Sequence, residues 1–260
     1  MMLRAALTVL LIALAAPASA GVSKAVLDAV YVEPTPGAAL PLNLSLQDES
    51  GRPLTLADAM GGHATVLLFA DYTCRTLCGP ILDFTTAALQ QSQLQPGADY
   101  RLVVIGLDAK DTLADARGMK ASRLDHDGPI ARAAVFLTGT TEVIARATSA
   151  LGYHFAYDHE HDQYAHPAAA FVLTKAGKVT RVLSGIGLNG TDLRLALVDA
   201  GEGHVGTLTD RFRLLCYGFD PARGIYTARI GRLLEISGVI TLIGMAAGAL
   251  VMHRMTKAAS

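Results

Sequence analysis

The sequence has little net charge, few cysteines and no internal repeats. Its 22 Lys and Arg residues are balanced by 23 Asp and Glu residues, so the formal net charge at pH 7 is −1. A near-neutral chain produces no long-range positive field, and we therefore expect no nucleic-acid partner. The absence of repeats and of low-complexity tracts excludes repeat architectures.

Residues 1–20 have the pattern of a secretory signal peptide. Arg4 provides a short positive segment, residues 5–16 are apolar, and residues 18–20 (Ala-Ser-Ala) form a small-residue cleavage site. A membrane-spanning helix needs roughly 17–25 apolar residues, so this stretch is too short to act as an anchor. We expect the signal to be cleaved and the mature chain to begin at Gly21.

A second apolar segment, ISGVITLIGMAAGALVM at 236–252, contains no charged residue. Its length is near the lower limit for a membrane-spanning helix, and we predict a span over 233–252. His253, Arg254 and Lys257 follow the segment and suit the cytoplasmic side of a membrane. A buried core helix is the alternative. With the export signal, this pattern predicts a single C-terminal anchor in the cytoplasmic membrane and a periplasmic or otherwise extracytoplasmic main domain.

These signals divide the chain into six parts. In order, they are the signal peptide (1–20), an extended arm (21–41), the main domain (42–205), a juxtamembrane segment (206–232), the span (233–252) and a cytoplasmic tail (253–260). The lipid bilayer is therefore an expected partner. Gly244 and Gly248 lie four positions apart in the span and allow close helix packing, which raises the hypothesis of a homodimer.

The three cysteines, Cys74, Cys78 and Cys216, are an odd number for an exported chain. They cannot form a complete disulfide framework, which indicates reactive or metal-binding sulfur. Cys74 and Cys78 follow the apolar run at 65–70. We interpret Cys216 as a small buried hydrophobic residue, with a third metal-binding thiol or an intermolecular disulfide as alternatives.

The apolar pattern predicts an α/β fold with a mixed sheet flanked by helices. Alternating leucines over 42–56 predict an N-terminal hairpin, and the continuous run YRLVVIGLD at 100–108 predicts a strand buried on both faces. Pro80 suits the first turn of a helix, with Phe84 on its apolar face. We expect a polar loop over 157–166. The other predicted elements are strands at 65–70, 133–138, 168–174 and 179–186, and helices at 111–124, 140–151 and 191–200.

If strands 65–70 and 168–174 are neighbours, Cys74, Cys78 and His166 meet at one edge of the sheet. Pro80 places Cys78 at or just before a helix N-terminus, where backbone N–H groups and the nearby Arg75 lower the pKa of a thiol. Two thiolates and an imidazole suit Cu(I), whereas Zn(II) would need a fourth ligand. Thiol–disulfide exchange, or a structural disulfide beside an ordinary loop histidine, stays open.

The order of these features resembles the Sco/SenC family of thioredoxin-like copper proteins. The resemblance rests on the hairpin 42–56, the strand TVLLFA, the C-x-x-x-C motif, the stretch VVIGLDAKDT and the late histidine, and it covers roughly residues 40–200. It implies a thioredoxin-like fold and binding of Cu(I) or Cu(II) by Cys74, Cys78 and His166. It also implies copper delivery to, or thiol reduction for, the binuclear copper centre of cytochrome c oxidase. Gly79 departs from the family, which commonly has proline directly after the second cysteine.

Other residues near the expected site have weaker claims. Asp108 and Asp111 are candidate carboxylates that orient His166 or repel a thiolate, with helix capping as the alternative. The histidines and aspartates of 154–162 are a candidate for metal capture, although a solvated polar loop is the simpler interpretation. Pro167 is a candidate for a cis peptide bond, because thioredoxin-like folds commonly place a cis-proline opposite the cysteine motif.

Residues and resemblance together predict a membrane-anchored, extracytoplasmic copper chaperone. Its expected partners are a copper-accepting subunit of a terminal oxidase and an upstream thiol reductant. The alternatives are a thiol–disulfide oxidoreductase or thiol peroxidase, in which Cys74 attacks and Cys78 resolves, and a copper or redox sensor. His166 discriminates among them, because a reductase or peroxidase has no clear need for an imidazole at that position.

Overall fold

The structure of the protein, a computed structural model, describes residues 24–74, 78–185, 188–201, 217–220, 225–228, 238–241, 243 and 245. The predicted signal peptide, Cys216, the tail 253–260 and most of the predicted span 233–252 lie outside these residues. The described residues of that span are helical. Across the described ranges, no helix is both long enough and apolar enough to cross a membrane.

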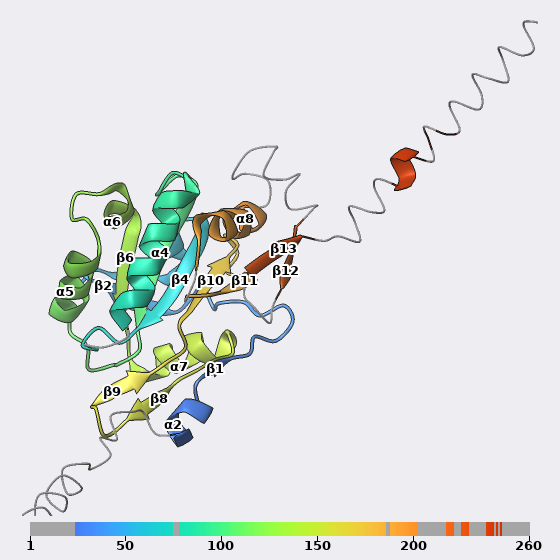
Figure 1. Cartoon of the computed structure of the whole chain (residues 1–260). Coiled ribbons are helices and arrows are strands. Elements are labelled where there is room, and N and C mark those ends of the chain that lie inside the picture. Colours follow the sequence, from blue (N-terminus) through green and yellow to red (C-terminus); the bar gives the residue numbers. More distant parts are fainter. Residues whose placement is uncertain are drawn as a thin grey trace, which may run out of the picture.

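A seven-stranded mixed sheet forms the centre of the main domain (Figure 1). In sheet order, its strands are β11 (Val179–Ser184), β10 (Ala169–Leu173), β4 (Ala64–Ala70), β5 (Tyr100–Gly106), β6 (Ala134–Thr138), β2 (Ser45–Asp48) and β3 (Pro53–Thr55). β4, β5 and β6 are parallel, whereas β10 is antiparallel to β4 and β2 is antiparallel to β6. β4 is buried along its whole length, which explains its unbroken apolar sequence.

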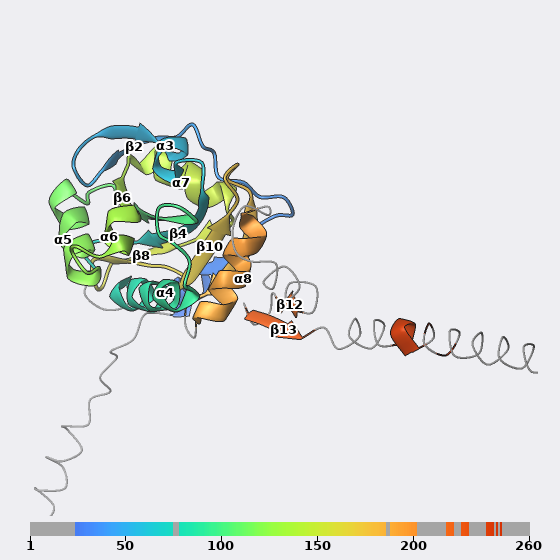
Figure 2. The same cartoon turned by 90° about the horizontal axis from the view of Figure 1, so that it is seen from above.

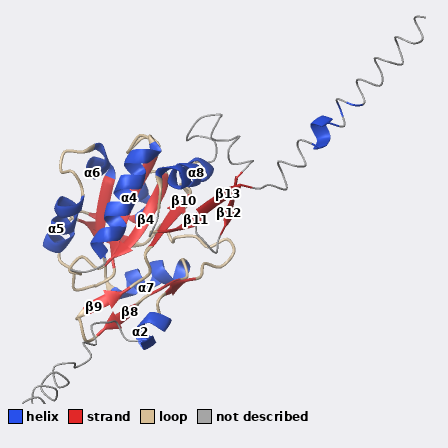
Figure 3. Ribbon diagram, viewed as in Figure 1, coloured by secondary structure: helices blue, strands red, loops and turns tan. Residues whose placement is uncertain are grey.

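Helices cover both faces of this sheet (Figure 3). They are α3 (Leu56–Met60), α4 (Cys78–Ser92), α5 (Leu113–Arg123), α6 (Pro129–Ala133), α7 (Thr141–Ala150) and α8 (Gly190–Ala200). Thr55 and Thr112 begin α3 and α5 with capping boxes, in which the threonine and an aspartate three residues later bond each other's backbone N–H. The predicted strands and long helices are confirmed, with ends that differ by one or two residues, and the predicted hairpin over 42–56 is confirmed with its first strand beginning at Ser45. The mixed sheet flanked by helices fits a thioredoxin-like fold.

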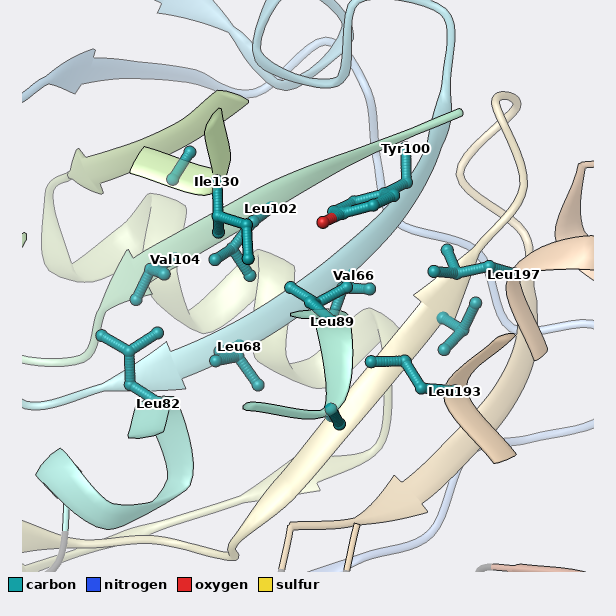
Figure 4. Packing of buried hydrophobic residues seen from close by; sticks show 14 of the residues in the cluster. Val66, Leu68, Leu82, Leu89, Tyr100, Leu102, Val104, Ile130, Leu193 and Leu197 are labelled. Atoms are coloured by element: carbon teal, nitrogen blue, oxygen red, sulfur yellow. The ribbon is translucent and has the colours of Figure 1, made fainter. Parts of the chain in front are cut away.

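Successive residues of the central strands supply two hydrophobic cores, one on each face of the sheet. Val66 and Leu68 of β4 pack with α4 and α8 (Figure 4), in a core that also includes residues of α5. Leu67 and Phe69 pack with α3 and α7 on the other face. Figure 2 shows α4 and α8 together on one face. Because side chains alternate along a strand, successive residues of β4 belong to the two cores in turn. The end of β4 is therefore a rigid base for the residues that follow it.

Among the described residues, three two-stranded sheets lie outside the central sheet. They pair β1 (Tyr31–Val32) with β7 (Tyr153–His154), β8 (Ala156–Asp158) with β9 (Gln163–Ala165), and β12 (Tyr217–Asp220) with β13 (Ile225–Ala228). The β8–β9 hairpin corrects the prediction of a polar loop over 157–166. Its cross-strand pair Tyr157–Tyr164, with ring centroids 5.1 Å apart, stabilises two strands that lack an apolar alternation.

Two further predictions need correction. The arm 21–41 is not extended throughout, because it contains the short helix α2 (Lys24–Asp28) and strand β1. Phe84 does not belong to the buried face of α4, since it is 46% exposed. The buried face passes instead through Ile81, Leu82 and Leu89, which pack into the core shared with α8.

Candidate metal and thiol site

The segments that carry the predicted site residues meet at one edge of the central sheet. β4 leads at its C-terminal end into the turn Asp71–Cys74, and α4 begins at Cys78. β10 is antiparallel to β4, so the end of β4 and the start of β10 share an edge. His166 lies three residues before β10 and therefore reaches the edge at which the cysteine turn begins. The predicted neighbouring strands and the placement of Cys78 at a helix N-terminus are confirmed.

Asp71 holds the turn that carries Cys74. Its Oδ1 accepts hydrogen bonds from the backbone N–H groups of Thr73 at 3.0 Å and Cys74 at 3.1 Å, and from the Thr73 hydroxyl at 2.9 Å. Its Oδ2 accepts the backbone N–H of Tyr164, on β9, at 2.9 Å. Asp71 is only 1% exposed, so these bonds satisfy a carboxylate that would otherwise be costly to bury.

Cys74 is half-buried and packs against the core that contains α4 and α8. Its Sγ donates a hydrogen bond to Oε1 of Gln163, on β9, at 3.5 Å. The β8–β9 hairpin thus contacts the cysteine turn through both backbone and side chain. The side chain of Cys78 lies outside the described part of the structure, so the joint ligand set of Cys74, Cys78 and His166 stays a prediction.

The imidazole of His166 is oriented by two oxygens. Its Nδ1 lies 2.9 Å from the Tyr153 hydroxyl and 3.2 Å from the carbonyl oxygen of Pro167, and the same hydroxyl donates to that carbonyl at 2.9 Å. A carbonyl oxygen can only accept, so the proton of the neutral ring belongs on Nδ1. The lone pair is then on Nε2, which is the nitrogen available to a metal ion or a proton donor.

Burial lowers the pKa of His166 below its ordinary value. The Pro167 carbonyl, Cys74 and Asp71 act in the opposite direction but do not overcome burial. The neutral ring is therefore favoured at neutral pH, which is the form that binds metal ions.

The two candidate carboxylates have different surroundings. Asp108 accepts the backbone N–H of Lys110 at 2.8 Å within its own turn. Asp111 is 8% exposed and accepts the backbone N–H of Tyr72 at 3.1 Å. It therefore contacts the turn that carries Cys74. Burial raises the pKa of Asp111 to about 7, with smaller contributions from Asp71 and Asp108. Neither aspartate caps α5, because Thr112 does so.

The polar residues of 154–162 do not form a metal site. Asp158 accepts hydrogen bonds from the backbone of Glu160 and from His161, and His154 stacks on Tyr31 at a centroid distance of 4.1 Å. Among the described residues, no group of three or more His, Cys, Asp or Glu side chains is arranged to hold a metal ion. Bonds within the β8–β9 hairpin and the stacking of His154 on β1 therefore account for these contacts.

The peptide bond between His166 and Pro167 is trans, which corrects the expectation of a cis bond. The Pro167 carbonyl accepts both the Tyr153 hydroxyl and the backbone N–H of Ala169 at 3.0 Å. The same carbonyl oxygen lies 3.2 Å from Nδ1 of His166.

Sequence reasoning missed three residues that shape the site: Asp71, Tyr153 and Gln163. Asp71 stands between a buried strand and a cysteine, where an acidic residue is a usable signal for a turn. Tyr153 and Gln163 carry no such signal, because their roles depend on the β7 and β9 strands that the sequence pattern did not reveal.

Known structures resemble this fold at low sequence identity. A protein from Aquifex aeolicus VF5, provisionally described as an electron transfer protein, is 21% identical with a TM-score of 0.56, covering 66% of this chain and 100% of its own. Arabidopsis thaliana ScoI, described with copper bound, is 18% identical with a TM-score of 0.51, covering 63% and 96%. BsSco, described as a Sco-family cytochrome c oxidase assembly protein with a disulfide switch, is 18% identical with a TM-score of 0.51, covering 65% and 97%.

Two comparisons use the sequence directly. No curated protein matches the chain. A family model, described as SCO1/SenC, matches residues 33–191, which include the hairpin, the cysteine pair and the late histidine. Because this match extends over more than half of the 260 residues, the chain belongs to the SCO1/SenC family.

Proposed function

We propose that this chain is a membrane-anchored, extracytoplasmic copper chaperone that binds copper through Cys74, Cys78 and His166. The observation that supports the proposal is that the turn ending at Cys74 and the segment that carries a neutral, oriented His166 lie at the same edge of the sheet, where α4 begins. Family membership supports it, as do the copper in Arabidopsis thaliana ScoI and the oxidase-assembly description of BsSco. The acceptor would be a copper-accepting subunit of a terminal oxidase.

The donor set fits Cu(I) as cargo. Two thiolates and one imidazole form a soft, three-coordinate set that Cu(I) accepts, whereas a structural Zn(II) site needs a fourth ligand. The α4 helix begins at Cys78, and the positive end of a helix dipole would favour a thiolate at this position. Tyr153 and the Pro167 carbonyl keep the proton of His166 on Nδ1, so Nε2 is ready to bind without a change of tautomer.

Release would proceed by ligand exchange. Thiolates of the acceptor would replace Cys74, Cys78 and His166 one at a time, so that the cargo never leaves protein ligands. Formation of a Cys74–Cys78 disulfide removes two electrons and two protons and leaves no thiolate to bind copper. An upstream thiol reductant is therefore part of the proposal.

The same cysteine pair supports a second candidate, a thiol–disulfide oxidoreductase. A cysteine at a helix N-terminus is well placed for exchange, and here α4 begins at Cys78. The disulfide switch described for BsSco is a thiol–disulfide change in a protein of similar fold. In this alternative, Cys74 attacks, Cys78 resolves and His166 is dispensable.

Anaerobic Cu(I) titration of the reduced protein against a competing chelator tests the proposal. We expect one tight equivalent, weakened by Cys74→Ala, Cys78→Ala and His166→Ala. Each loss should exceed the roughly 10–100-fold cost of removing an outer-shell partner. The exposed His126→Ala serves as the matched histidine control and should bind like the parent. Parental affinity in His166→Ala, together with high disulfide reductase activity, would reject the chaperone in favour of the oxidoreductase.

A further inference from the structure

Asp71 connects the two segments that carry the proposed ligands. One carboxylate oxygen accepts three hydrogen bonds from Thr73 and Cys74, all within the cysteine turn. The other accepts the backbone N–H of Tyr164 at 2.9 Å, from a residue 93 positions away in sequence. Tyr164 is two residues before His166. A single buried side chain therefore spans from the backbone of Cys74 to the strand that leads into His166.

The hairpin that carries Tyr164 needs such a connection. β9 pairs with β8 and takes no part in the seven-stranded sheet, as Figure 1 shows at the lower end of the domain. A two-stranded hairpin by itself is only marginally stable in water, so its place depends on contacts with the domain. Asp71 supplies one from the end of β4, and the Cys74–Gln163 bond supplies another.

Charge and burial make the Asp71 contact strong. Hydrogen bonds to an ionised carboxylate are about twice as strong as those between neutral groups. At 1% exposure, Asp71 is shielded from water that would compete for the N–H of Tyr164. All three donors on the turn side meet at one oxygen, which leaves the other oxygen for Tyr164.

We propose that Asp71 is a positioning residue, whose two oxygens fix the separation between Cys74 and His166. This inference rests on the proposed function, because the separation matters only if both residues bind the same ion. Asp71 itself is not a ligand in this arrangement, since both of its oxygens are already occupied by hydrogen bonds from the protein. Its role is to hold the empty site close to the geometry of the loaded one, so that less ordering is required on binding.

Asp71→Asn tests the inference selectively. The Asn carbonyl oxygen can still accept the three turn bonds, whereas the NH₂ group that replaces Oδ2 cannot accept from Tyr164. We expect Cu(I) affinity to fall roughly 10- to 100-fold, as for other residues that orient ligands. Asp48→Asn is a matched control. Asp48, 6% exposed, also accepts from the N–H and hydroxyl of a residue two positions later, in the remote β2–β3 hairpin. Its replacement should leave affinity unchanged.

A double-mutant cycle separates positioning from general loss of stability. If Asp71 acts through His166, the Asp71→Asn/His166→Ala protein should bind Cu(I) no more weakly than His166→Ala alone. Losses that multiply in the double variant would overturn the inference, and so would parental affinity in Asp71→Asn.

Amide exchange in the copper-free protein gives a readout that does not depend on the proposed function. In Asp71→Asn, the Tyr164 amide should exchange at least about 10-fold faster, whereas the Cys74 amide should change little. Unchanged exchange at Tyr164 would reject the inference whatever the copper result. If the affinity of the parent does not depend on His166, the proposed function fails, and the Asp71 connection is then judged on Tyr164 exchange alone.

Discussion

At the scale of single residues, hydrogen bonds orient the side chain of His166 in the candidate site. Nδ1 of His166 faces the Tyr153 hydroxyl and the Pro167 carbonyl, which leaves Nε2 with its lone pair. The Tyr153 ring, 2% exposed, packs on Phe69 at a centroid distance of 4.6 Å, so the hydroxyl has a fixed position. The core thereby sets the orientation of a residue at the edge of the sheet.

Tyr153→Phe removes this hydroxyl and keeps the ring in the core. The Pro167 carbonyl still lies 3.2 Å from Nδ1, so one of the two groups that favour the proton on Nδ1 remains. We expect Cu(I) affinity to fall by about 10-fold, the lower end of the range for lost outer-shell partners. Competition titration measures the change. Tyr157→Phe is the control, because it removes a tyrosine hydroxyl that bonds Asp162 within the β8–β9 hairpin. If the two variants bind Cu(I) with equal affinity, Tyr153 does not contribute to the orientation of His166.

Asp111 gives a residue-scale prediction on stability. Its pKa is raised to about 7 in the folded protein, chiefly by burial, from an unfolded value of 3.8. The folded state therefore binds a proton more tightly than the unfolded chain, and the associated stability is fully present below pH 3.8 and is lost as pH rises toward 7. Asp111→Asn removes this dependence, while its amide oxygen can still accept the Tyr72 N–H.

We expect Asp111→Asn to gain roughly 1–3 kcal/mol relative to the parent between pH 5 and pH 8, since one pKa unit corresponds to about 1.4 kcal/mol. Urea unfolding of the copper-free protein at the two pH values measures this difference. Asp108→Asn changes a carboxylate in the same turn and is the control. If the Asp111→Asn and parent profiles are parallel, Asp111 does not titrate between these pH values.

At the scale of elements, burial decides what the sequence can predict. β4 and β5 are buried on both faces, so their continuous apolar runs identify them directly. Antiparallel pairing of β10 with β4 then brings the late histidine to the cysteine turn, as the order of the strands predicts. Cys74, Cys78 and His166 could be nominated for this reason, although the joint position of their side chains could not.

The β8–β9 hairpin shows where sequence reasoning ends. Its residues include aspartates, histidines and a glutamine, which predict a loop by composition. Tertiary contacts make it a hairpin, because Asp71 bonds the Tyr164 backbone and Cys74 bonds the Gln163 side chain. Such contacts join residues about 90 positions apart, so they produce no periodic pattern in the sequence. The residues that orient the proposed ligands were missed for the same reason.

At the scale of the whole molecule, the segment 233–252 bears on where the protein is located. The described residues of the segment 233–252 are helical and expose large apolar side chains at Val239, Ile240, Ile243 and Met245. Large apolar side chains exposed together are typical of a surface that contacts another protein or a membrane. Since the same segment carries no charge from 236 to 252, a bilayer is the environment that we propose.

A variant truncated after Arg232 tests this placement. The full chain should be extracted from membranes only by detergent, whereas the truncated chain should appear in the extracytoplasmic soluble fraction. Both mature proteins should begin at Gly21, as determined by N-terminal sequencing, because the signal is cleaved independently of the anchor. The truncated protein should keep its Cu(I) affinity, since Cys74, Cys78 and His166 all precede residue 206. Recovery of the full chain without detergent would reject the C-terminal anchor, and loss of Cu(I) affinity on truncation would mean that residues beyond 232 contribute to the site.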